Sequence, residues 1–192
     1  MAEKRCCFIG HRTIEQTDEL LALLTDTIRR LILEEGVCYF LFGSRSAFDD
    51  LCHCIVTEFQ QEFPNIVRVA YTRRSEYAVK AEEKVKMERT WATLLKTEVK
   101  LKDYDAEVQS DRVFSAGKAS FVERNQEMID DSDFCVFYYN ESYLPPRRKR
   151  SNRDLSSYQP KSGTRLAYEY AVQKSKKTDK VVINTFIPSG TD

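Results

Sequence analysis

Short, almost entirely apolar runs alternate along this chain with longer segments that have helical periodicity. An apolar run without polar alternation is typical of a strand buried on both faces, as in a parallel sheet. We therefore expect strands at residues 5–10, 37–43, 65–71, 134–139 and 180–186, and a further short strand at residues 111–116.

The segments between these runs carry apolar residues at helical spacing and have recognisable ends. Possible capping boxes begin at Thr13 and Ser120, Gly36 closes the first helical segment and Pro64 stops the second. The pattern predicts helices at residues 17–36, 44–63, about 75–102, from 120 onward, and 162–177. Strands that alternate with helices predict an α/β fold: one Rossmann-like domain over residues 1–192, with a mostly parallel sheet and helices on both faces. Residues of about 140–161 read as an inserted basic loop.

Composition narrows the class of protein. The 192 residues are 42% hydrophobic and 31% charged with a net charge of zero, which fits one globular domain and disfavours a dedicated nucleic-acid binder. No apolar run reaches the length of a membrane span and the N-terminus lacks a signal-type apolar region, so we expect a cytoplasmic protein without membrane contact. Most cysteines lie in apolar runs and should be reduced, and Cys52, His53 and Cys54 face apart on a helix, so we expect no metal site.

Three predicted corners at strand ends combine glycine with hydroxyl or cationic residues. Helix N-termini favour anions there, and arginine offers a planar fork that matches phosphate. The corners are Gly10-His11-Arg12, Gly43-Ser44-Arg45-Ser46 and Ser162-Gly163-Thr164-Arg165. Each alone reads as an ordinary capped turn, but the three together predict a phosphate-bearing ligand.

Other residues near these corners refine the prediction. His11 should be exposed and able to touch the ligand, and Asp49 could bind a ribose hydroxyl or complement the helix dipole as a first-turn acid. The fingerprint G-x-G-x-x-G and the P-loop motif are both absent, so we expect neither nicotinamide-dependent chemistry nor a P-loop ATPase, and no cofactor.

The ordered segments "CFIGHR", "FGSRSAFD", "ERNQEMIDDSDFCVFYY" and "SGTRLAYEYA" resemble the SLOG superfamily, which includes the Lonely Guy phosphoribohydrolases and the DNA-processing protein A fold. The opening and the ending look most like its small bacterial and phage branch of unknown function. The Lonely Guy enzymes carry E-R-K-x-x-M, so the resemblance implies that Arg124 contacts the nucleotide, with Asn125 in place of the usual lysine. Without the resemblance, Arg124 reads as a surface arginine paired with Glu123 or Glu127.

The family's catalytic glutamate is missing from its position three residues after Thr164, where this chain has Ala167. A carboxylate is needed to stabilise oxocarbenium-like charge or to activate water, and arginine can do neither. We therefore expect a protein that binds a nucleotide or nucleotide-derived signal, such as an ADP-ribose derivative, as a sensor or sequestering protein. The alternative is a phosphoribohydrolase or N-glycosidase that uses Arg124 with Glu169 or Asp49 as the acid.

The basic segment "PPRRKRSNR" supports a third function, single-stranded DNA binding, which ranks below the other two. A lid over a charged ligand and a solvated loop are the other interpretations of this segment. The resemblance also implies a homodimer.

Overall fold

The computed structural model describes residues 3–43, 46–73, 104–110, 119–144 and 161–188. Its centre is one six-stranded sheet with strand order β4-β3-β2-β1-β5-β6, in which every neighbouring pair is parallel. The strands are β1 (Lys4–Gly10), β2 (Val37–Phe42), β3 (Val67–Arg73), β4 (Ala106–Ser110), β5 (Phe134–Tyr138) and β6 (Val181–Asn184). The predicted α/β class with a parallel sheet is confirmed.

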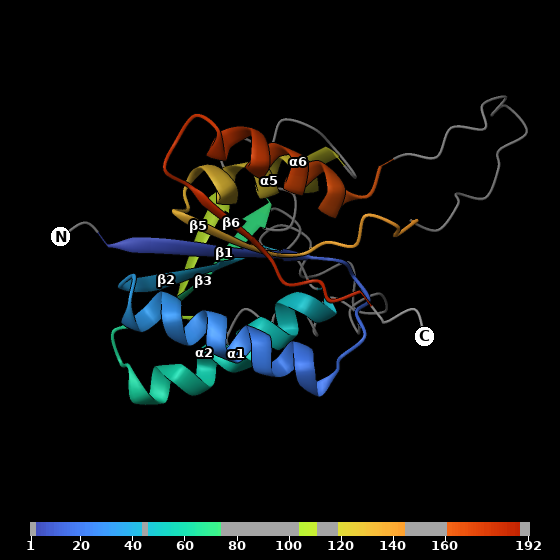
Figure 1. Ribbon diagram of the computed structural model, residues 1–192. Coiled ribbons are helices and arrows are strands. Elements are labelled where there is room, and N and C mark those ends of the chain that lie inside the picture. The colour runs from blue at the N-terminus through green and yellow to red at the C-terminus, as the bar shows by residue number, and fades with distance from the viewer. Residues whose placement is uncertain (1–2, 44–45, 74–103, 111–118, 145–160, 189–192) are drawn as a thin grey trace, which may run out of the picture.

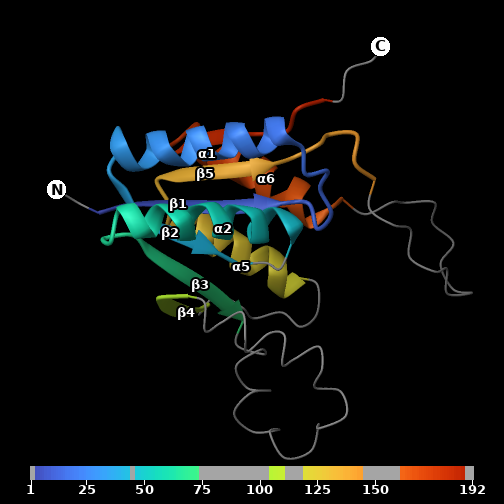
Figure 2. The same cartoon turned by 90° about the horizontal axis from the view of Figure 1, so that it is seen from below.

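Helices cover both faces of the sheet, as predicted (Figure 1). They are α1 (Asp18–Leu33), α2 (Ala47–Glu62), α5 (Ala119–Asp130) and α6 (Gly163–Ser175). Helices α1 and α2 lie together on one face, which Figure 2 shows from below, and α5 and α6 lie on the other. None of the helices in the described ranges is long and apolar enough to cross a membrane.

Alternate residues of the buried strands feed two separate hydrophobic cores. Cys6 and Phe8 of β1 pack with α1 and α2, whereas Cys7 and Ile9 of the same strand pack with α5 and α6. This two-sided burial explains why β1 lacks polar alternation, because successive side chains of a strand point to opposite faces.

Strand β4 was not predicted at its actual position. The structure places it at Ala106–Ser110. The predicted strand at residues 111–116 and the predicted helix at about 75–102 lie outside the described residues. The described chain resumes at residue 119, where α5 begins. The first four residues of β4 are exposed, because it is an edge strand with its faces largely uncovered. Such a strand has no need of the apolar run that marks the central strands.

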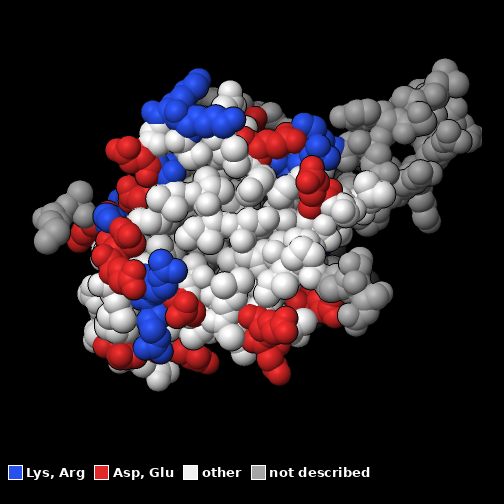
Figure 3. Space-filling view, viewed as in Figure 1, with Lys and Arg blue, Asp and Glu red and all other residues white. Residues whose placement is uncertain are grey.

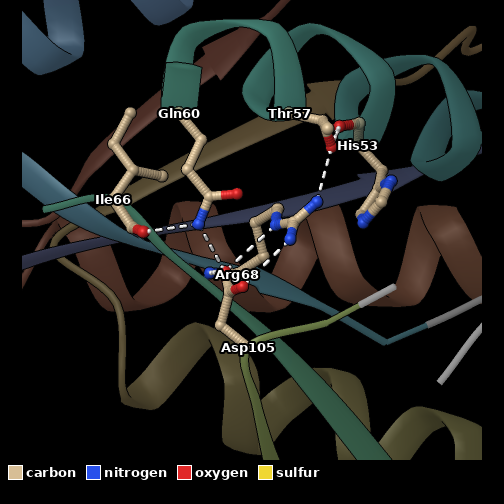
Figure 4. A network of polar contacts seen from close by, with 6 residues as sticks. All are labelled: His53, Thr57, Gln60, Ile66, Arg68 and Asp105. Atoms are coloured by element: carbon tan, nitrogen blue, oxygen red, sulfur yellow. Dashed lines mark hydrogen bonds and ion pairs between the residues drawn. The ribbon is translucent and has the colours of Figure 1, made fainter. Parts of the chain in front are cut away.

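A polar network fastens β4 to the neighbouring strand β3 (Figure 4). The Arg68 guanidinium donates to both carboxylate oxygens of Asp105, from Nη2 at 2.9 Å and from Nε at 3.0 Å. Gln60 of α2 donates to the same carboxylate at 2.8 Å. The Arg68 side chain lowers the pKa of Asp105 to about 2, so the carboxylate form stabilises the fold.

We expect Asp105→Asn to lower the free energy of unfolding by about 1 to 2 kcal/mol at neutral pH, after allowance for partial solvent screening. The folded-state pKa is depressed, so this contribution is present above the usual value of about 3.9 and is lost as the pH falls toward about 2. Urea titrations of both proteins at neutral and acidic pH measure the difference. The exposed Lys4–Glu35 pair is the control, and Glu35→Gln should change stability by less than about 0.5 kcal/mol. If the difference in the free energy of unfolding between Asp105→Asn and the parent did not change with pH, the stabilising role of the Asp105 carboxylate would be contradicted.

Candidate functional site

The chain reverses its direction of progress across the sheet between β1 and β5. From β1 it builds β2, β3 and β4 on one side, and it then returns to place β5 and β6 on the other. In open parallel sheets, ligands bind beyond the carboxyl ends of the strands at such a switch point. The residues that follow Gly10 and Tyr138 are therefore where a ligand site is expected.

Two helix N-termini meet the corner at the end of β1. The Thr164 hydroxyl of α6 donates to the Gly10 carbonyl oxygen at 3.0 Å. The Ala47 backbone N–H of α2 donates to the Arg12 carbonyl oxygen at 3.0 Å. The corners at Gly10 and Gly163 and the helix that follows Gly43 are thus neighbours, as the sequence predicts.

The glycines at these corners differ in their surroundings. A Cβ on Gly10 would lie 2.4 Å from the Phe48 ring, and one on Gly43 would lie 2.2 Å from Met128 Sδ and 2.9 Å from Arg124 Nε. A Cβ on Gly163 would meet nothing within 4 Å. Gly10 and Gly43 are therefore required by packing, and only Gly163 faces open space.

Arg124 lies against the Gly43 corner and is only 2% exposed. Its guanidinium carbon lies 5.3 Å from the centre of the Phe121 ring, and its Nη2 donates to Asn125 Oδ1 at 3.3 Å. The alternative of a surface arginine is therefore wrong. Burying a cation costs several kcal/mol unless other groups compensate. A buried arginine at this edge of the sheet is therefore a candidate for contact with an anionic ligand.

The expectation that His11 is exposed is wrong, because the side chain is only 2% exposed. Its Nε2 accepts a hydrogen bond from the Asn140 backbone N–H at 3.0 Å, and tyrosine rings surround the imidazole. Burial lowers the pKa of His11. The imidazole is thus neutral at neutral pH, and with Nε2 as the acceptor its proton is on Nδ1.

Serine side chains cap both helix N-termini at the site. Ser46 Oγ accepts from the Asp49 N–H, and an Asp49 carboxylate oxygen accepts from the Ser46 N–H, which completes a capping box. Ser162 Oγ accepts from the Arg165 N–H at 3.1 Å. The capping box accounts for the burial of Asp49 Oδ2 without a ribose.

The remaining predicted residues are less central. Arg12 is exposed, and Ser44 and Arg45 lie outside the described residues. Glu169 is 41% exposed and accepts from Lys161 and Arg165, which lower its pKa. Arg165 is therefore engaged with its own helix, and Glu169 lies in a surface ion pair.

Three residues of the site were not singled out as site residues from the sequence. Asn140 and Tyr143 follow β5 and contact His11. Glu127 is 9% exposed and accepts from the hydroxyl of Ser110 at the end of β4. The sequence indicates Glu127 only as a partner for Arg124, and it places Asn140 and Tyr143 in the inserted basic loop.

The surface around β6 carries charges of both signs. Figure 3 shows them interspersed around the margin of this face, with uncharged residues across its middle. A nucleic-acid backbone requires a continuous basic surface, and the described part of this face has none. The basic segment of residues 147–153 lies outside the described residues.

The strand order and the two helical layers define a Rossmann-like α/β protein whose polar corners lie at the carboxyl edge of its sheet. No protein-family model and no curated protein sequence matches the chain.

Proposed function

We propose that this protein binds a nucleotide or a nucleotide-derived signal at the carboxyl edge of its sheet. The observation that carries the proposal is the gathering of buried polar side chains at this edge. Buried polar groups are costly unless they are hydrogen-bonded. Thr164, Ser46 and Asp49 are bonded within the protein, so the position of these groups at the switch point of the sheet is what supports a ligand site. The buried polar residues at strand ends, at the adjoining helix N-termini or on α5 are His11, Ser46, Asp49, Thr72, Ser110, Arg124, Asn125 and Thr164.

The charge of the site favours an anionic ligand. The N-termini of α2 and α6 adjoin the β1 corner, where their dipoles attract negative charge. Arg124 adds a permanent cation with a fork that matches phosphate oxygens. The resemblance to the SLOG superfamily assigns the same role to Arg124. A phosphate-bearing nucleotide, for example an ADP-ribose derivative, would bring negative charge to the helix N-termini and phosphate oxygens to Arg124.

Binding without turnover is the better-supported form of this proposal. The position of the family's glutamate is occupied by Ala167, which is 1% exposed within the core of α5 and α6. The two candidate replacements are engaged elsewhere, Asp49 in a capping box and Glu169 in surface ion pairs. Loss of a general acid or base costs about 100- to 10,000-fold in rate, which favours a cytoplasmic sensor or sequestering protein over a phosphoribohydrolase.

A thermal-shift panel of AMP, ADP, ADP-ribose, cyclic ADP-ribose and ribose 5-phosphate tests the proposal. A ligand at ten times its Kd should add about 1.4 kcal/mol to the free energy of unfolding, which raises Tm by roughly 3 to 6 °C in a domain of this size. Adenosine, which lacks phosphate, is the control and should give a smaller shift. No shift with any phosphate compound at millimolar concentration would contradict the proposal.

The same incubations, analysed by chromatography, test the phosphoribohydrolase alternative. We expect no free base to appear. Base release that disappears in Glu169→Gln would replace binding by hydrolysis as the function. The homodimer that the resemblance implies stays a prediction for light scattering, and single-stranded DNA binding ranks third.

A further inference from the structure

A tight turn after β5 fixes the Tyr143 ring on the His11 imidazole. Asn140 organises the turn with three hydrogen bonds: its N–H donates to His11 Nε2, its Oδ1 accepts from the Ser142 N–H at 2.9 Å, and its carbonyl accepts from the Tyr143 N–H at 3.1 Å. The Tyr143 and His11 ring centres are 4.1 Å apart with 33° between the ring planes. The ring is therefore held in place before any ligand arrives.

Packing in the two hydrophobic cores does not explain the position of Tyr143. The side chain is half-buried and belongs to neither hydrophobic core, unlike its neighbours Tyr138 and Tyr139. A loop tyrosine without a role in the core would be free to point into solvent. Here, backbone hydrogen bonds hold its ring over a buried histidine.

His11 offers a hydrogen-bond donor that the described protein does not use. Its imidazole is 2% exposed, and its one hydrogen bond to a described residue is the one that Nε2 accepts from Asn140. The Nδ1–H group makes no hydrogen bond within the described ranges. This donor is therefore available to a ligand or to water.

The position of this ring pair fits a specific part of the ligand. His11 directly follows Gly10, whose carbonyl oxygen accepts a hydrogen bond from the Thr164 hydroxyl. Gly163, which precedes Thr164, faces open space. The ring pair therefore adjoins the N-terminus of α6, where the phosphate is expected. Aromatic side chains bind nucleobases by stacking, because every base has a flat π face.

We infer that His11 and Tyr143 form the subsite for the planar base of the ligand. The base stacks on the Tyr143 ring, and His11 Nδ1–H donates to an acceptor of the same ligand. This inference rests on the proposed function, since it assigns the second half of the nucleotide whose phosphate occupies the α6 corner.

Calorimetric titration with AMP, GMP, CMP, UMP and ribose 5-phosphate separates the base from the sugar phosphate. We expect at least one mononucleotide to bind about 5- to 150-fold more tightly than ribose 5-phosphate. Tyr143→Leu should remove most of this advantage and leave the affinity for ribose 5-phosphate unchanged, whereas Tyr143→Phe should retain it. Tyr39→Leu is the matched control, because Tyr39 is also half-buried but lies toward the amino end of β2, away from the carboxyl edge of the sheet. This variant should bind like the parent.

His11→Gln tests the donor separately from the fold. The glutamine Oε1 can still accept from the Asn140 N–H, but the Nδ1–H donor is lost. We expect about 5- to 10-fold weaker mononucleotide binding, measured at a temperature where the variant is folded, because loss of the contacts with the tyrosine rings should lower Tm.

The outcomes distinguish the subsite from the proposed function. If no phosphate compound binds, both are overturned. If ribose 5-phosphate binds as tightly as every mononucleotide, or if Tyr143→Leu weakens ribose 5-phosphate and mononucleotides by the same factor, the base subsite is overturned and the proposed function stands.

Discussion

Arg124→Met is expected to lower the affinity for the tightest-binding nucleotide of the panel by at least about 30-fold. Truncating one partner of a buried, charge-assisted hydrogen-bonded pair costs about 2 to 5 kcal/mol or more, and the 2% exposure of Arg124 means that little water would screen its contact with phosphate. Methionine keeps an unbranched apolar side chain and removes the guanidinium, whose Nε and Cζ lie beside Gly43. Calorimetric titration of the variant and the parent measures the loss.

Arg12→Met provides the matched control for this prediction. Arg12 lies at the same edge of the sheet, but it is exposed, so the same substitution should cost less than about 5-fold in affinity, because surface charges are screened. Arg124→Lys keeps the charge without the fork and should fall between the two. Equal affinities of the parent and Arg124→Met would remove Arg124 from the site, and the main support for an anionic ligand would be lost with it.

The fold could be predicted because its central strands are buried on both faces. Runs such as residues 5–10 and 134–139 are nearly all apolar, which only a covered parallel sheet accommodates. Strand β4 could not be predicted in this way, because an exposed edge strand has no such apolar run. Its position depends instead on Arg68 and Asp105, which are 37 residues apart.

The site could be predicted in outline and not in detail. Glycine corners at strand ends are local features, so the sequence alone indicates where helix N-termini gather. The burial of His11 depends on a hydrogen bond to Asn140, 129 residues away, and on tyrosine rings that approach only in the folded state. Likewise, Asp49 fitted two interpretations because a capping box and a ribose contact demand the same residue type at the same helix position.

The second large effect expected is on stability, from Gly10→Ala. The added methyl group would lie 2.4 Å from two atoms of the Phe48 ring, and Phe48 is fully buried at the start of α2. The clash must displace either the core or the helix that donates to the Arg12 carbonyl. We expect a loss of about 2 to 3 kcal/mol in the free energy of unfolding, or roughly 5 to 10 °C in Tm.

The cause of this loss is steric and not conformational, and a double-mutant cycle separates the two. Among the described residues, only Gly36 has a positive φ, so alanine suits the backbone of Gly10. Phe48→Leu should therefore relieve part of the clash, and the double variant should lose less stability than the sum of the two single variants. Gly163→Ala is the control at a corner with nothing within 4 Å, and it should leave stability unchanged or raise it by up to about 1 kcal/mol through helix propensity. Strict additivity of Gly10→Ala and Phe48→Leu would contradict the packing role, and Gly10 would then have to be explained by close approach of the ligand to the backbone.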